Sequence, residues 1–296
     1  TDVAITGGTL QIANDITLER NIFTSTSSGG AISTAGHNLV LKGAVENHTH
    51  TEVDNSNPAN PKLTLVYDDF GHLVKSDAGT LTLTSDQSNY YVGTALNSDG
   101  KEVAITGNTV INGGTLSVAK DEFLGIQEKL FELDTSGQVT TNKTNDAKDW
   151  DRGNLLIDGG TLETTAGLTT QRTINIGVAG ATINVVGAAN NTTLEGLVKG
   201  SGGLIKEGEG TLHVSLQSSR YTTDDIALDP NYNKNTYVGK TVVKAGVLEI
   251  NTVERDLGVS PEGVELAGGN LKINGASALA KLSLTGTGGA IDTTGS

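Results

Sequence analysis

The sequence contains no cysteine and no methionine among its 296 residues. Without cysteine, a disulfide framework, a thiol nucleophile and a thiolate metal site are excluded. Without methionine the natural start is missing, so we expect a fragment of a longer chain. No apolar run reaches the roughly 18 residues of a membrane-spanning helix, and no signal peptide opens the sequence. We therefore expect no direct membrane insertion, and we expect any targeting signal to lie outside these residues.

Aromatic residues are also scarce, at 4% of the chain, with a single tryptophan. A globular core of this length normally draws on Phe, Tyr and Trp, because they bury the most area per residue. The apolar residues are instead mostly Val, Ile, Leu and Ala, and glycine is frequent at 39 residues. Small aliphatic side chains that stack in register suit a thin, repetitive core better than a spherical one.

Positive charge is in the minority, because 20 Lys and Arg residues face 34 Asp and Glu residues, for a formal net charge of −14. Binding to nucleic acid relies on clustered Lys and Arg, so we expect no nucleic-acid partner. The same charge disfavours an anionic membrane surface. It is typical of a long, exposed and soluble surface.

A short repeat, Gly-Gly-Thr-Leu followed by alternating residues, runs through the chain. It occurs at residues 7–12, 113–118 and 159–164, with looser copies at 245–250 and 268–273. The alternation has a period of two, which predicts a strand with one apolar face and not a helix. The glycines supply backbone angles that other residues avoid, so each copy predicts a tight corner that leads into a strand.

A longer repeat contains the short one, in two copies at about residues 72–125 and 203–258. Each copy has Leu-Val/Ile-Lys, then Gly-Thr-Leu, Tyr-Val-Gly, Thr-Val and a final Leu-Gly. A third series, which begins with Gly-Ala, occurs at residues 30–34, 180–184 and 289–293. Repeats of this kind indicate a solenoid, in which each unit buries its apolar face only by stacking on its neighbours.

These patterns predict an all-β fold, a right-handed parallel β-helix with protruding loops or hairpins. A β-sandwich would use more aromatic core residues, and a propeller would show a blade period of about 40–50 residues. We expect residues 1–296 to form one β-helix with about twelve coils of about 20–25 residues each.

The long repeat resembles the passenger-associated transport repeat of bacterial autotransporters. The resemblance implies a passenger of type V secretion, at the cell surface of a Gram-negative bacterium or secreted from it. It also implies export through the protein's own C-terminal β-barrel translocator, outside this fragment. The serine-protease motifs that some passengers carry are absent from the sequence, so a central or stalk-like piece of a passenger is expected.

Four polar segments interrupt the repeats, at residues 44–62, 94–108, 126–152 and 218–235. Insertions are where function usually resides on a solenoid, so these are the candidate binding loops. Their candidate binding residues are Phe131, Trp150, Tyr221 and Tyr232. In the segment 126–152 the alternation favours a hairpin, with a short amphipathic helix as the alternative. In either form we expect its apolar residues to cover the side of the β-helix, with a binding surface as the second interpretation.

His48 and His50 alternate along one strand, with Glu52 and Asp54 in step. His48, His50 and Asp54 are weak candidates for a divalent metal such as zinc, but two histidines without a further shell favour a solvated polar loop. We expect no cofactor. No catalytic constellation is present in the sequence, so we expect no enzyme.

Two functions remain. The first is an adhesin or self-association module whose polar faces and loops bind a host-cell glycan or protein, or another passenger, as in aggregation or biofilm formation. The second is a stalk that presents an N-terminal catalytic domain such as a serine protease. A β-helix that cleaves polysaccharides is a third and weaker reading.

Overall fold

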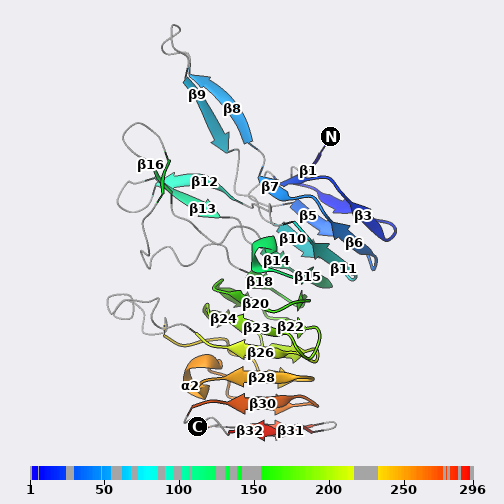
Figure 1. The fold of residues 1–296 in the computed structure, drawn as a ribbon, viewed down its shortest axis with the longest axis vertical. Helices are drawn as coiled ribbons and strands as arrows, with labels where there is room; N and C mark the ends of the chain where they lie inside the picture. Colours follow the sequence, from blue (N-terminus) through cyan, green and yellow to red (C-terminus); the bar gives the residue numbers. More distant parts are fainter. Residues whose placement is uncertain are drawn as a thin grey trace.

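A computed structural model describes the chain at residues 2–5, 7–24, 30–47, 49–54, 62–67, 73–85, 91–96, 102–106, 109–124, 131–133, 139–141, 155–216, 233–275, 278, 281–285 and 288–293. These residues form a rod of short parallel strands with hairpins at its side (Figure 1). The predicted parallel β-helix is confirmed.

The strands of the rod form four parallel sheets. The three-stranded sheet contains β1 (Val3–Ile5), β4 (Ile22–Thr24) and β7 (Val45–Asn47). The seven-stranded sheet contains β2 (Thr9–Gln11), β5 (Gly30–Ser33), β10 (Leu73–Ser76), β14 (Thr109–Ile111), β18 (Leu155–Ile157), β21 (Ile174–Ile176) and β24 (Val198–Gly200).

The ten-stranded sheet contains β3 (Ile16–Leu18), β6 (Asn38–Leu41), β11 (Thr80–Leu83), β15 (Thr115–Val118), β19 (Thr161–Thr164), β22 (Ala181–Val185), β25 (Leu204–Glu207), β27 (Thr241–Val243), β29 (Val264–Leu266) and β31 (Leu282–Leu284). The six-stranded sheet contains β20 (Leu168–Thr170), β23 (Asn191–Leu194), β26 (Thr211–Val214), β28 (Val247–Ile250), β30 (Asn270–Ile273) and β32 (Ile291–Asp292). In the described part of the chain the rod also includes the helical turns η1 (Asp121–Leu124) and α2 (Val253–Asp256).

Where a coil has strands on all three faces, it passes through them in a fixed order. The chain runs from the seven-stranded sheet to the ten-stranded sheet and then to a third face, before it returns to the seven-stranded sheet. The three-stranded sheet forms the third face in the first coils, and the six-stranded sheet forms it in the later ones. Among the described residues, no strand continues the third face between β7 and β20.

The core is a stack of aliphatic side chains. On the ten-stranded sheet Leu39, Leu81, Leu116, Leu162 and Ile183 are paired in register, and each is at most 1% exposed. Burial of one such side chain stabilises the fold by about 1.5–3 kcal/mol. The residues between them face outward, which is the alternation that the sequence shows.

The glycines of the repeats make the corners tight. Gly79 has a φ of +93°, and a Cβ atom there would lie 2.1 Å from the carbonyl oxygen of His37 in the preceding coil. Only glycine combines this backbone angle with so close an approach.

The uninterrupted coils vary in length, and their paired strand residues lie 18 to 24 residues apart. Stacked side chains on uninterrupted coils are 21 residues apart for Glu163 and Asn184, and 23 apart for Glu249 and Lys272. Where an insertion intervenes, the separation grows, to 37 residues between Glu207 and Lys244. Ten strands stack in the longest sheet, fewer than the expected twelve or so coils, because the insertions use residues that the estimate assigned to coils.

The repeats do not keep to one face of the rod. The Leu-Val-Lys strand of the first copy is β10 in the seven-stranded sheet, whereas the matching strand of the second copy is β25 in the ten-stranded sheet. The third series lies on three different sheets, as β5, β22 and β32. Equal motifs therefore do not occupy the same sheet. All three faces have the same aliphatic lining, so a motif fits on any of them.

Candidate functional site

Four insertions interrupt the coils of the rod. Each insertion is defined as the residues between two consecutive described parts of the rod. The first insertion is 48–72, the second is 86–108, the third is 125–154 and the fourth is 217–232. Each one precedes the return of the chain to the seven-stranded face. The first three precede β10, β14 and β18, and the fourth precedes a segment whose Thr236 and Val238 amides donate to carbonyls of β24. The insertions therefore all arise on one side of the β-helix.

Uninterrupted coils make the same turn briefly. Three residues connect β20 to β21, and three connect β23 to β24. The turn itself thus needs almost no chain, and the insertions are additions to a corner that closes without them.

The first three insertions each contain an antiparallel hairpin. The hairpins are β8 (Thr49–Asp54) with β9 (Lys62–Tyr67), β12 (Tyr91–Leu96) with β13 (Glu102–Thr106), and β16 (Phe131–Leu133) with β17 (Val139–Thr141). The last is the hairpin that the alternation in residues 126–152 favours over a helix. Strand β9 contacts β12, and β13 contacts β16, so the hairpins form a row (Figure 1).

The bounds of the insertions differ from the expected ones. Val45–Asn47 pairs in parallel with β4, so the rod continues past residue 44. The second hairpin begins at Tyr91, which places the Tyr-Val-Gly motif of the first copy outside the parallel rod. In the second copy the same motif starts with Tyr237, which is fully buried in a coil. Asn235 is buried too, so the fourth insertion ends before it.

The candidate binding residues fall in or beside the insertions. Phe131 is the first residue of β16. Trp150, Tyr221 and Tyr232 lie outside the described residues, so their role as binding residues stays a prediction.

The candidate metal ligands are in the first insertion. His50 and Asp54 lie on β8, as does Glu52, and His48 lies outside the described residues. Among the described residues no group of three or more His, Asp or Glu side chains is placed to hold a metal ion. In the same part of the chain no helix is long and apolar enough to span a bilayer.

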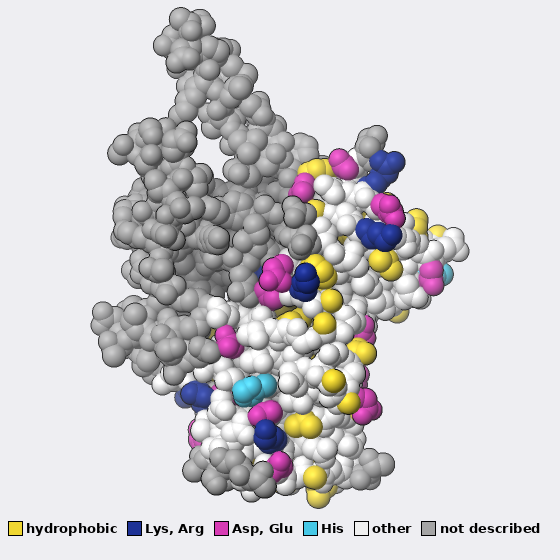
Figure 2. Space-filling view, viewed as in Figure 1, with side chains coloured by type: hydrophobic (Ala, Val, Ile, Leu, Met, Phe, Trp, Pro, Cys, Tyr) yellow, Lys and Arg dark blue, Asp and Glu magenta, His cyan; other side chains and the backbone are white. Residues whose placement is uncertain are grey.

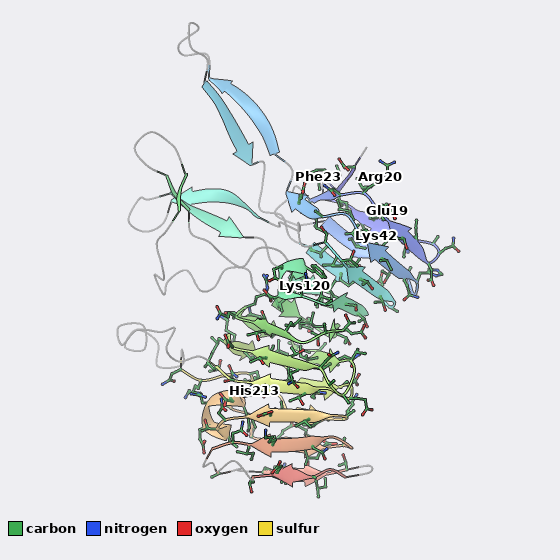
Figure 3. The ribbon with its side chains drawn as sticks, viewed as in Figure 1. Glu19, Arg20, Phe23, Lys42, Lys120 and His213 are labelled. Atoms are coloured by element: carbon green, nitrogen blue, oxygen red, sulfur yellow. The ribbon has the colours of Figure 1, made fainter. Side chains whose placement is uncertain are left out.

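The outer faces of the rod carry small ladders of polar side chains. The Lys42 ammonium lies 2.8 Å from a Glu19 carboxylate oxygen on the neighbouring coil (Figure 3). On the six-stranded sheet Glu249 accepts hydrogen bonds from Lys272 and Asn274. Figure 2 shows positive and negative side chains interspersed over the described surface in view, which suits solubility and gives no single-sign docking field.

Each long repeat contains a buried lysine that the sequence alone did not predict to lie in the interior. Lys75 is 0% exposed, and its ammonium donates to the carbonyl oxygens of Ser76, Asp77 and Gly113 at 2.8, 2.7 and 3.2 Å. The first two carbonyls belong to its own corner, and the third belongs to the next coil, beyond the second insertion.

Lys206 repeats this arrangement in the second copy. It is also 0% exposed, and it donates to the carbonyl oxygens of Glu207, Gly208 and Ala245 at 2.6, 2.7 and 3.2 Å. The Ala245 carbonyl lies beyond the fourth insertion. Burial lowers the pKa of both lysines from 10.5 to about 8, against the opposing attraction of nearby acidic residues. The two copies thus share their local contacts although they lie on different faces.

The second glycine of the short repeat makes room for this arrangement. Gly114 has a φ of +60°, and a Cβ atom there would lie 2.6 Å from the Lys75 ammonium and 2.3 Å from the Asp77 carbonyl oxygen. Gly246 has a φ of +62° in the second copy and faces carbonyls of the Gly208 corner. The Leu-x-Lys and Gly-x-Leu parts of the repeat therefore form one structural unit.

Comparison with known proteins agrees with the repeats. The passenger-associated transport repeat family matches residues 73–101, 102–118 and 232–250, which include Lys75 and Gly246. The chain is also similar to the adhesin BmaC autotransporter of Brucella suis biovar 1 (strain 1330), with 32% identity over 152 residues. The repeats and this similarity support an autotransporter passenger domain with passenger-associated transport repeats.

The similarity to the adhesin covers 51% of this passenger segment and 3% of that relative, so the segment corresponds to a small part of its length. No solved structure matches the chain with significance. As a passenger segment the chain is exposed at the surface of a Gram-negative bacterium or secreted from it.

The passenger holds a buried ion pair at the third insertion. The Arg172 side chain donates from Nε and Nη2 to the two carboxylate oxygens of Asp121, both at 3.1 Å, and from Nη2 to the Asp121 carbonyl at 3.2 Å. Asp121 begins η1, just before the insertion. Arg172 lies two residues after β20, the third-face strand of the coil that follows the insertion.

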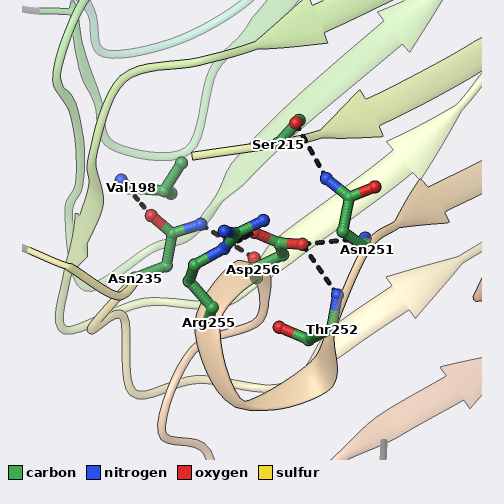
Figure 4. Close-up of polar contacts among 7 residues, drawn as sticks. All are labelled: Val198, Ser215, Asn235, Asn251, Thr252, Arg255 and Asp256. Carbon is green, nitrogen blue, oxygen red and sulfur yellow. Dashed lines mark hydrogen bonds and ion pairs between the residues drawn. The ribbon is translucent and has the colours of Figure 1, made fainter. Parts of the chain in front are cut away.

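The passenger segment is anchored again where the fourth insertion ends (Figure 4). The Asn235 side chain accepts a hydrogen bond from the Val198 amide and donates one to the Asp256 carbonyl, both at 2.8 Å. The Asp256 carboxylate in turn accepts from the amides of Asn251 and Thr252. Asn235 thereby joins the coil before the insertion to the coil after it.

Proposed function

We propose that this passenger segment is adhesive and that its insertions carry the contact surface. The observation that carries the proposal is that all four insertions arise on one side of the rod, before the seven-stranded face. Extra chain at one corner of an otherwise regular solenoid projects side chains beyond the stacked faces. A row of such projections gives one partner several adjacent contacts.

The similarity to an autotransporter that is itself named an adhesin supports the same role. We propose a host-cell glycan or protein as the partner, with Phe131, Trp150, Tyr221 and Tyr232 as contact residues. Tyrosine and tryptophan are favoured at binding surfaces because one end of each ring system is apolar and the other is polar. We further propose that the segment is not an enzyme and that it is exported by its own C-terminal translocator.

Attachment of displaying bacteria tests this function. Each insertion is replaced in turn by a short Gly-Ser linker in the displayed passenger, and binding to host cells is counted. We expect at least one replacement to lower attachment by about tenfold or more, the effect of losing a single binding hot spot, while surface display and protease resistance of the rod are unchanged. A matched control substitutes Thr82→Lys and Thr182→Lys on the outer face of the ten-stranded sheet, and it should leave attachment intact.

Two results would redirect the proposal. If all four replacements leave attachment unchanged, the segment is a stalk that presents another domain, a role that the unbroken ten-stranded sheet also suits. If a replacement abolishes aggregation between displaying cells but leaves host-cell attachment intact, the partner is another copy of the passenger.

A further inference from the structure

Buried charged groups are unevenly distributed along the rod. In the described part of the chain they are Lys75, Asp121, Arg172, Lys206 and Asp256. A charge in an apolar core is unfavourable unless it is paired or fully hydrogen-bonded, so a rod that holds five needs a reason for them. The first four each contact the coil on the far side of an insertion.

We propose that these groups are staples that close the β-helix across its insertions, so that an insertion can be exchanged while the rod persists. Lys75 closes the second insertion through the Gly113 carbonyl, and Lys206 closes the fourth through the Ala245 carbonyl. Asp121 and Arg172 close the third as an ion pair.

The separations along the chain show why closure needs support. The staple contacts join residues 38, 39 and 51 apart, whereas contacts between uninterrupted coils join residues 18 to 25 apart. A longer loop costs more conformational entropy to close, and the strands that it joins are only three or four residues long. A contact that brings the two coils together directly offsets that cost.

The first insertion is bridged through two hydroxyl groups. Ser33 donates to the Asp77 carboxylate and Thr34 to the Ala78 carbonyl, at 2.5 and 2.6 Å, both across 44 residues. Asp77 has a φ of +61°, which is costly for a residue other than glycine, and Ser33 holds its side chain in place. Each of the four insertions is thus bridged by side chains of the rod.

The two lysine staples do not depend on the side chains of the insertions. Lys75 and Lys206 bind backbone carbonyls of residues 76, 77, 113, 207, 208 and 245, which all belong to coils of the rod. The sequence of the second or fourth insertion can therefore change without loss of these lysine contacts, which is what a variable binding segment on a fixed rod requires.

A crossed set of variants of the full 296-residue chain tests the proposal. Lys206→Met is made in the natural chain and in a chain with residues 218–232 replaced by a Gly-Ser-Gly linker. The readout is the rate of amide hydrogen exchange in β26, β27 and β28. With the insertion present, we expect Lys206→Met to accelerate exchange by about tenfold or more, the loss of a charged hydrogen-bond donor. In the shortened chain we expect less than about threefold, because the coil then closes through a short turn.

Lys75→Met is the matched control, because it removes the equivalent lysine beside a different insertion. Its effect on β10, β14 and β15 should be the same in both backgrounds. Equal acceleration by Lys206→Met in the two backgrounds, or no acceleration in either, overturns the proposal. If Lys206→Met unfolds the natural chain but not the shortened one, the proposal is supported. If it unfolds both, Lys206→Gln, which keeps donor hydrogens, is compared in the same two backgrounds with the same criterion.

Discussion

Arg172 donates two hydrogen bonds to the Asp121 carboxylate across the third insertion. Both side chains are almost fully buried, with exposed fractions of 3% for Arg172 and 11% for Asp121. Loss of Arg172 removes these hydrogen bonds from a buried carboxylate, so Arg172→Met should lower the free energy of unfolding by about 3–5 kcal/mol. Urea denaturation followed by circular dichroism measures this. Lys42→Met, which removes an exposed ion pair with Glu19, should cost much less, because ion pairs in contact with solvent stabilise a fold weakly. Equal costs for the two variants would contradict the assignment of a buried staple.

The buried lysines predict an unusual pH dependence. Burial lowers the pKa of Lys75 and Lys206 to about 8, whereas the unfolded chain titrates near 10.5. Between these pH values the unfolded state holds more protons than the folded state, so the lysine contribution to stability rises with pH. The stability of the natural chain minus that of the variant with Lys75→Met and Lys206→Met should therefore increase from pH 7 to pH 10, by on the order of 1–3 kcal/mol per lysine. Urea titrations at pH 7, 8, 9 and 10 test it, and a difference that falls with pH would rule it out.

Gly246 should tolerate no side chain. Its φ is +62°, and a Cβ atom would lie 2.3 Å from the Gly210 carbonyl oxygen, so Gly246→Ala should destabilise the chain by more than about 1 kcal/mol. Gly8 has open space around its Cβ position, and Gly8→Ala should change stability by about 0.5 kcal/mol or less. Thermal melts of the two variants, side by side, give the comparison. A Gly246→Ala variant as stable as Gly8→Ala would mean that the corner relaxes.

Asp77 and Gly208 occupy matching corners of the two repeats, with φ values of +61° and +77°. Asp77→Gly relieves the backbone but loses the hydrogen bond from Ser33, so its net effect on stability should be within about 1 kcal/mol. Asp77→Val keeps the unfavourable backbone angle and also loses the bond, so it should cost about 2 kcal/mol or more. Urea denaturation of the two variants measures their free energies of unfolding. A valine variant that is as stable as the glycine variant would contradict this prediction.

Much of the fold was predictable because each strand has a local pattern of apolar and polar residues. In Leu39-Val40-Leu41 the alternation predicts which side chains are buried, and the glycine before the next strand predicts the corner. The face of the rod on which a strand lies was not predictable, because all three faces have the same aliphatic lining. The sheet to which β10 or β25 belongs depends on where the insertions occur along the chain. A local motif does not encode the positions of the insertions.

The staples were hidden for a different reason. Lys75 stands two residues after Leu73, so the period of a strand places both side chains on the same face. That alternation was the available signal, but a lysine at an inward position is expected to be exposed unless it is paired. Its partners are backbone carbonyls that only the folded corner brings together. Asp121 and Arg172 are 51 residues apart, and no sequence pattern connects them.

The central claim is that the insertions carry the adhesive surface of the passenger segment, and competition by the purified chain tests it most directly. Host cells are incubated with the 296-residue chain before bacteria that display the passenger are added. We predict that the natural chain blocks attachment and that a chain with all four insertions replaced by linkers, still folded by circular dichroism, does not. Equal blocking by the two chains would contradict the account, because the contact surface would then lie on the rod itself.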